Sequence, residues 1–151
     1  MARATGKDHA RINLDLWGND DWLDLSPSAQ HLYFVLWTSP QLSYCGTGDW
    51  HPGKIASKAR GWTPADVELA AEELSHGLFL IIDTDTSEFI LRSWMKHDGL
   101  WRTPNMAVSM ANARADLASR MLRGVVVFEA LKIRKREPTS PSWDRDAVAK
   151  M

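Results

Sequence analysis

Three groups of side chains could carry chemistry: one possible acid–base pair, three possible metal ligands, and basic residues distributed along the chain. His97 precedes Asp98, a pairing that general acid–base catalysis can use. No nucleophile, glycine-rich phosphate loop or second carboxylate accompanies this pair in a recognised pattern. Cys45, Asp49 and His51 could bind a metal, but they lack paired CxxC or HxxxH spacing. We therefore expect no catalytic site, no metal and no cofactor.

Basic residues carry the stronger signal, because Lys and Arg contact DNA phosphates while Thr and Asn can reach base edges. They surround a predicted pair of helices and the hairpin that follows. The residues expected to bind DNA are Lys54, Lys58, Arg60, Thr63, Arg92, Lys96, Arg102 and Asn105. Thr63 and Asn105 are the expected base contacts. An arm that carries Arg3, Lys7 and Arg11 is expected to reach an adjacent minor groove.

Two features near these basic residues, a pair of tryptophans and a basic run, could serve the fold instead of DNA binding. Trp94 and Trp101 lie among these cations and could face nucleic acid, but tryptophans are usually mostly buried. For Trp94 we favour a role in pinning the C-terminal helices onto the hairpin. The basic run from Lys132 to Arg136 is most simply a solvated helix end, which is favourable beside the negative end of the helix dipole.

The first half of the chain must position the basic residues. Residues 11–17 alternate apolar and polar types, as a half-buried strand does. Ser26 and Pro27 predict a helix start, and the helix should end before Pro40. Residues 41–50 are expected to form a loop or a short strand. The buried stripe of this helix is predicted to be Ala29, Leu32, Tyr33 and Leu36.

A second pair of helices should follow, separated by a tight turn at Gly61. The first covers residues 52–59, and the second begins with Thr63 as its N-cap and Pro64 behind it. Gly77 should close the second helix with a left-handed cap. The predicted buried residues of the second helix are Val67, Ala70, Ala71 and Leu74.

The second half is predicted to hold a hairpin and a helical region. Two β-rich runs, residues 78–83 and 89–94, flank a turn-prone segment. Beyond a loop over 99–104, residues 106, 110, 113, 117 and 121 are apolar at the spacing of one helical face, and a second helical stretch continues to Leu131. Residues 138–151 are expected to form a frayed tail.

Composition and charge limit the classes of function. With 44% apolar and 25% charged residues, the chain can form one ordinary core. The longest apolar runs are far shorter than the ~20 residues of a membrane span, and no leader pattern opens the sequence, so we expect a cytoplasmic protein without membrane contact. Residues 1–90 carry 6 basic and 13 acidic side chains and residues 91–151 carry 12 and 6, giving halves of −7 and +6. This polarity could steer a polyanion or dock the halves on each other.

The segment KIASKARGWTPADVELAAEELSHGLFLII, residues 54–82, resembles a winged helix-turn-helix. The Ile55–Ala56 pair, Gly61 and Thr63 stand where that family has a first helix, a turn and a second N-cap. More narrowly, ARINLDLW, LSPSAQHLYFVLW and ILRSWMKHDGLWRTPN are similar to small helix-turn-helix or replication-initiation-like proteins of actinobacteria and their phages. The resemblance covers roughly residues 10–132.

The resemblance implies an α+β fold: a winged helix-turn-helix domain with a β-hairpin wing plus a C-terminal helical extension. The implied segments are a flexible arm over 1–9, the winged-helix domain over 10–98, the helical extension over 99–136 and a disordered tail over 137–151. The implied function is binding of double-stranded DNA in transcriptional regulation or replication initiation, in a host bacterial cytoplasm.

The charge of the second helix departs from this family pattern. Its expected outward residues are Asp66, Glu68, Glu72 and Glu73, and Asp83, Asp85 and Glu88 surround the wing tip. Carboxylates repel phosphates, which puts major-groove readout by these elements in doubt. The alternative is a docking module whose acidic helix binds a basic surface of a host or phage protein. A homodimer through Met106 to Leu131 fits both hypotheses, because flexible methionines suit a dimer seam as well as a core.

Overall fold

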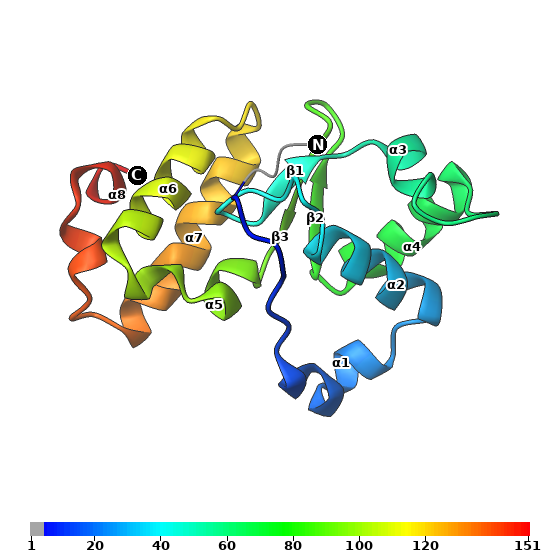
Figure 1. The fold of residues 1–151 in the computed structure, drawn as a ribbon, viewed down its shortest axis with the longest axis horizontal. Helices are drawn as coiled ribbons and strands as arrows, with labels where there is room; N and C mark the ends of the chain where they lie inside the picture. The colour runs from blue at the N-terminus through cyan, green and yellow to red at the C-terminus, as the bar shows by residue number, and fades with distance from the viewer. Residues whose placement is uncertain (1–4) are drawn as a thin grey trace.

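A small antiparallel sheet lies between two groups of helices (Figure 1). The computed structural model describes residues 5–151, and it has a mixed α+β architecture. On one side lie α1 (Asp20–Leu23), α2 (Pro27–Trp37), α3 (Pro52–Ala56) and α4 (Pro64–His76). On the other side lie α5 (Trp94–Asp98), α6 (Pro104–Ala115), α7 (Arg120–Arg136) and α8 (Asp146–Ala149). Three 3-10 helices, η1 (Leu14–Gly18), η2 (Leu100–Arg102) and η3 (Pro141–Asp144), complete the chain.

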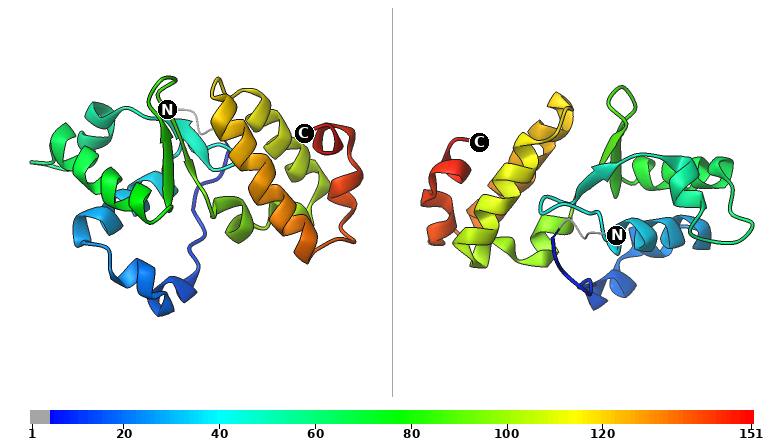
Figure 2. Two further views of the ribbon diagram at one scale, coloured as in Figure 1. Left: turned by 180° about the vertical axis from the view of Figure 1, so that it is seen from behind. Right: turned by 45° about the horizontal axis from the view of Figure 1, so that its top comes forward.

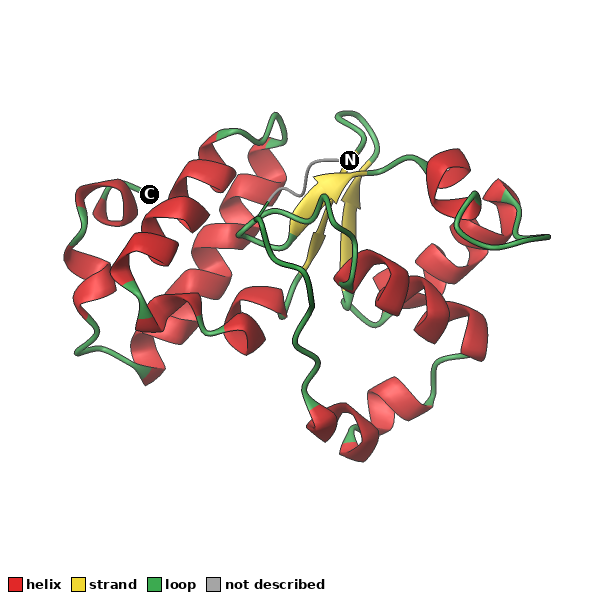
Figure 3. Cartoon of the chain, viewed as in Figure 1, coloured by secondary structure: helices red, strands yellow, loops and turns green. Residues whose placement is uncertain are grey.

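The sheet contains β1 (Thr47–Asp49), β2 (Leu80–Asp83) and β3 (Glu88–Leu91) in the order β1-β3-β2 (Figure 3). Both pairings are antiparallel, with Gly48 opposite Phe89 and Ile82 opposite Phe89. The predicted hairpin is therefore confirmed, although its second strand ends at Leu91 rather than Trp94. The turn between β2 and β3 includes Ser87 at a φ of 56°.

The helix starts that the sequence predicts are confirmed by their caps. The Ser26 hydroxyl accepts the Ala29 N–H at the start of α2, with Pro27 behind it. Thr63 and Asp66 form a reciprocal capping box at the start of α4. Both predicted apolar stripes are buried, so α2 and α4 pack on one another through them. Cap and stripe therefore agree on where each helix starts and which face it buries.

The end of α4 corrects the predicted glycine cap by one residue. Gly77 has a φ of −82°, and the left-handed residue is Leu78, at a φ of 60°. The Phe79 N–H donates to the Leu74 carbonyl and the Leu78 N–H donates to the Ser75 carbonyl, which is the bonding of a Schellman motif. Gly77 is thus the C-cap of α4 with a negative φ, and a leucine occupies the next position, which normally favours glycine.

Two predicted elements near the chain ends are wrong. Residues 11–17 do not form a strand, because the Asn13 side chain accepts the Asp15 N–H and starts η1 instead. Residues 137–151 form η3 and α8 rather than a disordered tail. Trp143 is buried, and its indole N–H donates to the Glu137 carbonyl. Burial of this large ring holds the tail against α6.

The predicted helical face from Met106 to Met121 is divided between two helices. α6 ends at Ala115, and Ser119 caps α7 by accepting the Leu122 N–H. Met110 and Leu117 are buried in the core. Met110 and Leu117, which the predicted homodimer surface over Met106 to Leu131 includes, are therefore used in the core, and association through the rest of that surface stays a prediction.

Candidate nucleic-acid interface

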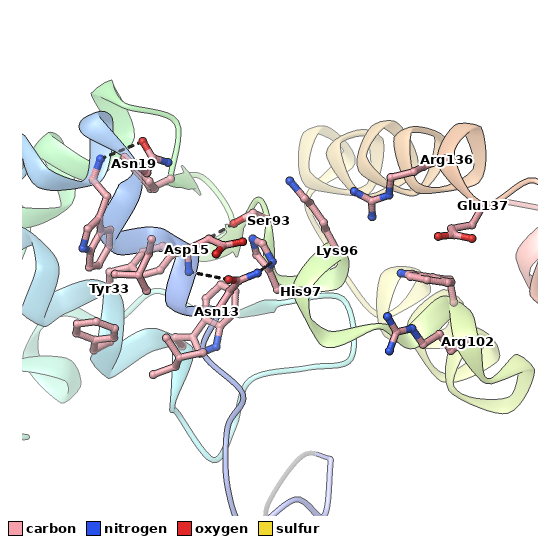
Figure 4. A pocket seen from close by; sticks show the side chains of 17 residues that line it. Asn13, Asp15, Asn19, Tyr33, Ser93, Lys96, His97, Arg102, Arg136 and Glu137 are labelled. Atoms are coloured by element: carbon pink, nitrogen blue, oxygen red, sulfur yellow. Dashed lines mark hydrogen bonds between the residues drawn. The ribbon is translucent and has the colours of Figure 1, made fainter.

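A pocket of about 520 Å³ opens where the segment before α1, α2 and the start of the C-terminal helices meet (Figure 4). Three cations from three separate elements line it: Lys96 of α5, Arg102 of η2 and Arg136 at the end of α7. The Arg102 guanidinium lies over the Trp101 ring, 4.9 Å from its centroid. The fold therefore brings together charges that are 40 residues apart in the sequence.

These three cations are available for an external partner. Within the described residues, no ion pair joins Lys96, Arg102 or Arg136 to a carboxylate. All three side chains are exposed. Asp15 and Glu137 also line the pocket, so its lining carries both signs of charge.

His97 lies between the cationic and the aromatic parts of the pocket (Figure 4). Its Nδ1 is 3.2 Å from the Asn13 amide nitrogen, and its ring lies 6.2 Å from that of Trp37. Burial lowers the pKa of His97, and the charges of Lys96 and Arg136 lower it further. The imidazole is therefore neutral at neutral pH and can exchange hydrogen bonds without adding charge.

His97 and Asp98 do not form the acid–base pair that their adjacency suggests. Asp98 instead receives a 2.7 Å ion pair from Lys7, whose ammonium also lies 5.2 Å from the centroid of Trp94. Trp94 itself is buried, as its structural alternative predicts. Lys7 is thus anchored to the fold, which corrects the predicted flexible arm for residues 5–9, and residues 1–4 of that arm lie outside the described residues.

Other residues of the predicted arm are also held against the fold. The Tyr44 hydroxyl donates to the Thr5 carbonyl, and the Trp37 indole donates to the Arg11 carbonyl. The Arg11 side chain is exposed, while Arg3 lies outside the described residues. Residues 5–11 therefore run along the protein surface and are tied to it at three points.

A second group of predicted residues lies at a different groove. Lys54 and Lys58 line a space of about 1120 Å³ between α3, β1 and α6. Asp49, Glu88 and Asp116 line the same space, so the two lysines face nearby carboxylates there. Arg60 is exposed in the turn before α4. The structure therefore does not bring these cations together with Lys96 and Arg102.

Two further predicted residues serve the fold. Arg92 has its Nε 3.8 Å from the buried carboxylate of Glu129, which also accepts a 2.7 Å contact from Lys132. Thr63 uses its hydroxyl to accept the Asp66 N–H in the capping box. Asn105 is exposed in the first turn of α6. Arg92 and Thr63 thus each have an internal partner, and their contact with DNA stays a prediction.

Several carboxylates that the sequence places on the outside have internal partners. Glu73 accepts both the backbone N–H and the hydroxyl of Ser26, each at 2.7 Å, and these bonds lower its pKa. At the wing, Asp83 accepts the Ser119 hydroxyl at 2.6 Å, which lowers the Asp83 pKa. Glu88 accepts the backbone N–H groups of Ala118 and Ser119. The hairpin is therefore docked on the start of α7.

Of the three cations that line the pocket, only Arg136 is absent from the residues predicted to bind DNA. It belongs to the basic run that was interpreted as a solvated helix end, and the run gave no sign that its last arginine would face Lys96. That proximity depends on the packing of α5 against α7.

Within the described residues, no cluster of three or more His, Cys, Asp or Glu side chains could hold a metal ion.

Comparison with known proteins adds no assignment: no protein-family model, curated protein or solved structure matches this chain. In the described part of the chain, no helix combines the length and the apolarity that a membrane crossing requires.

Proposed function

We propose that this chain is a winged-helix protein that binds double-stranded DNA, with its main phosphate contacts at Lys96, Arg102 and Arg136. The order of elements supports the fold assignment: α2, β1, α3, a tight turn, α4 and the hairpin β2–β3 follow the order of a winged helix-turn-helix. The resemblance of residues 54–82 points to the same fold. The tasks it suggests are transcriptional regulation or replication initiation in a bacterial cytoplasm.

One observation carries the DNA-binding proposal: three exposed cations from α5, η2 and α7 line one pocket, and none of them forms an ion pair within the described residues. Lys and Arg that neutralise phosphates release condensed counterions, which supplies most of the free energy of nonspecific DNA binding. The Arg102–Trp101 stack holds one guanidinium in place and so limits its loss of entropy on binding. Asn105, exposed a few residues further on, is the best remaining candidate for a base contact.

The acidic helix argues against base readout by α4. Glu68 and Glu72 are exposed on it, and Thr63 is used in the capping box. In this proposal DNA approaches the α5–η2 side, and α4 remains away from the phosphates. The rival function, a docking module that binds a basic surface of a host or phage protein, is favoured by the same exposed carboxylates.

Fluorescence anisotropy of a labelled random duplex tests the DNA proposal across a series of salt concentrations. The test variant replaces Lys96, Arg102 and Arg136 with alanine, and the matched control replaces Lys54, Lys58 and Arg60. Losing three phosphate contacts should reduce the slope of log K against log salt by about 2.7. The control should keep a slope close to that of the unmodified protein.

Two results would contradict this assignment. Absence of binding by the folded, unmodified protein at low salt would overturn DNA binding and favour the docking module. An equal loss of slope in the control would move the interface from the α5–η2 side to α3.

A further inference from the structure

α7 leaves an apolar stripe uncovered. Its inner face, with Leu122, Val126 and Ile133, is buried, yet Met121, Phe128 and Leu131 on its outer face are 48%, 58% and 53% exposed. These three side chains follow one another at intervals of seven and three residues, so they lie on one side of the helix. Gly124 lies within this stripe, and a Cβ there would meet nothing within 4 Å. A neighbouring chain could therefore approach the helix closely.

A groove of about 610 Å³ lies between α4 and β2. Its walls include Trp50, Ala71, Leu78, Ile81 and Ile82, and Glu68 and Glu72 stand at its edge. Leu78 is 51% exposed at a φ of 60°, as the left-handed residue that closes α4. It adds an exposed apolar side chain to the lining of this groove.

The two surfaces are complementary in charge as well as in polarity. Arg120 and Lys135 are exposed near the two ends of the α7 stripe, so either end can bring a cation to Glu68 and Glu72, which are exposed one turn apart on α4. Pairing of two α7 helices in antiparallel orientation would bring Arg120 of one copy near Lys135 of the other, which is repulsive. Charge therefore favours α4 over a second α7 as the partner of this stripe.

We propose that two copies of this chain associate by placing the α7 stripe of one copy in the α4–β2 groove of the other. Figure 2 (left) shows α7 and α4 on the same face of the molecule, on either side of the hairpin. A two-fold axis that lies in the plane of this face, between α7 and α4, lets both contacts form at once, which gives a closed dimer. An amphipathic helix lying in an apolar groove is a common recognition mode. The contact uses none of the three cations proposed to bind DNA, so it is tested separately.

Sedimentation velocity of the full chain tests the proposal over a range of protein and salt concentrations. The unmodified protein should form a dimer whose dissociation constant rises about ten-fold or more between low and high salt, because exposed ion pairs are screened. Phe128→Glu disrupts the stripe, and Glu68→Lys with Glu72→Lys reverses the charge of the groove. Each variant should be monomeric on its own and should keep the thermal unfolding of a folded protein, since all three side chains are exposed.

Mixing the two variants is the decisive step. Each supplies the surface that the other lacks, so the mixture should regain dimers that neither variant forms alone. Asp24→Lys with Asp144→Lys, on exposed sites of α1 and η3, makes the same change of charge and should leave the dimer intact. A monomeric unmodified protein at low salt, a groove variant that still dimerises, or a mixture that stays monomeric would each overturn the proposal.

Discussion

Glu73 of α4 is predicted to stabilise the fold, whereas the exposed Glu68 and Glu72 of the same helix are not. Its two oxygens accept the backbone N–H and the hydroxyl of Ser26, the N-cap of α2. In a capping box, the N–H of the N-cap is accepted by a side chain three residues later in the same helix. α2 has Ala29 at that position, so Glu73 of α4 performs this role across the helix interface.

The expected loss on Glu73→Ala follows from these two bonds. Hydrogen bonds to a charged group contribute about 1.5–3 kcal/mol each when buried. Glu73 is only partly buried, and water screens a carboxylate in that position, so we expect about 1–2 kcal/mol in total. For a chain of this length that corresponds to a fall in Tm of roughly 2–8 °C.

Urea unfolding followed by tryptophan fluorescence measures this difference, with Glu72→Ala as the matched control. Glu72 is the adjacent residue, carries the same charge and is exposed, so its replacement should change the stability by less than about 0.5 kcal/mol. Because the pKa of Glu73 is lowered in the folded state, its contribution is complete above the ordinary carboxyl value of 4.5 and disappears as the pH falls through the folded pKa. Equal effects of the two variants at neutral pH, or an undiminished Glu73 effect at about pH 3, would refute the reasoning.

Four further outcomes are expected. Leu78→Gly should raise the free energy of unfolding by about 1 kcal/mol in urea titration, because glycine adopts a positive φ without strain; a loss of stability would contradict this. Gly46→Ala should destabilise strongly, since its Cβ would lie 2.7 Å from that of buried Trp94 at a φ of 75°, and an unchanged Tm would count against the structure. Ser119→Ala should cost about 1 kcal/mol through the lost α7 cap; a stability unchanged in urea titration would show that the cap contributes nothing. His97 has a lowered pKa, so its contribution to stability is present above 6.5 and falls as the pH drops through the folded value; His97→Gln should flatten the stability curve in that range, and an unaltered curve would exclude His97 as its source.

The sequence predicts the middle of the fold well because local rules decide it there. At Ser26 and Thr63 the cap, the proline and the apolar spacing all specify the same helix start, and tertiary packing confirms each. At residues 11–17 the alternation predicts a strand, but one side-chain oxygen at Asn13 favours a turn. No strand of the described residues pairs with this segment, so nothing there offsets that local preference.

The candidate site is harder to predict, because the sequence shows which residues are charged but not which residues they pair with. Lys96 and Arg102 were predicted and do share a pocket, but Arg136 joins them only through the packing of α7 beside α5. Arg92 matches the same pattern, yet the buried Glu129 engages it. The sequence therefore shows which cations could contribute to a binding surface, and the fold determines which of these cations remain exposed.

The acidic residues also divide into those with internal partners and those that remain exposed. The exposed ones indicate how the two proposed surfaces are related. Asp66 and Glu73 cap helices and Glu88 holds the start of α7, so these carboxylates give no information about a partner. Glu68 and Glu72 have no such role among the described contacts and stand beside an apolar groove. A helix with that surface repels phosphates and suits a basic, apolar helix, which α7 provides. DNA binding through α5, η2 and the end of α7 then leaves α4 available to a second copy, so that one dimer would present two phosphate-binding rims.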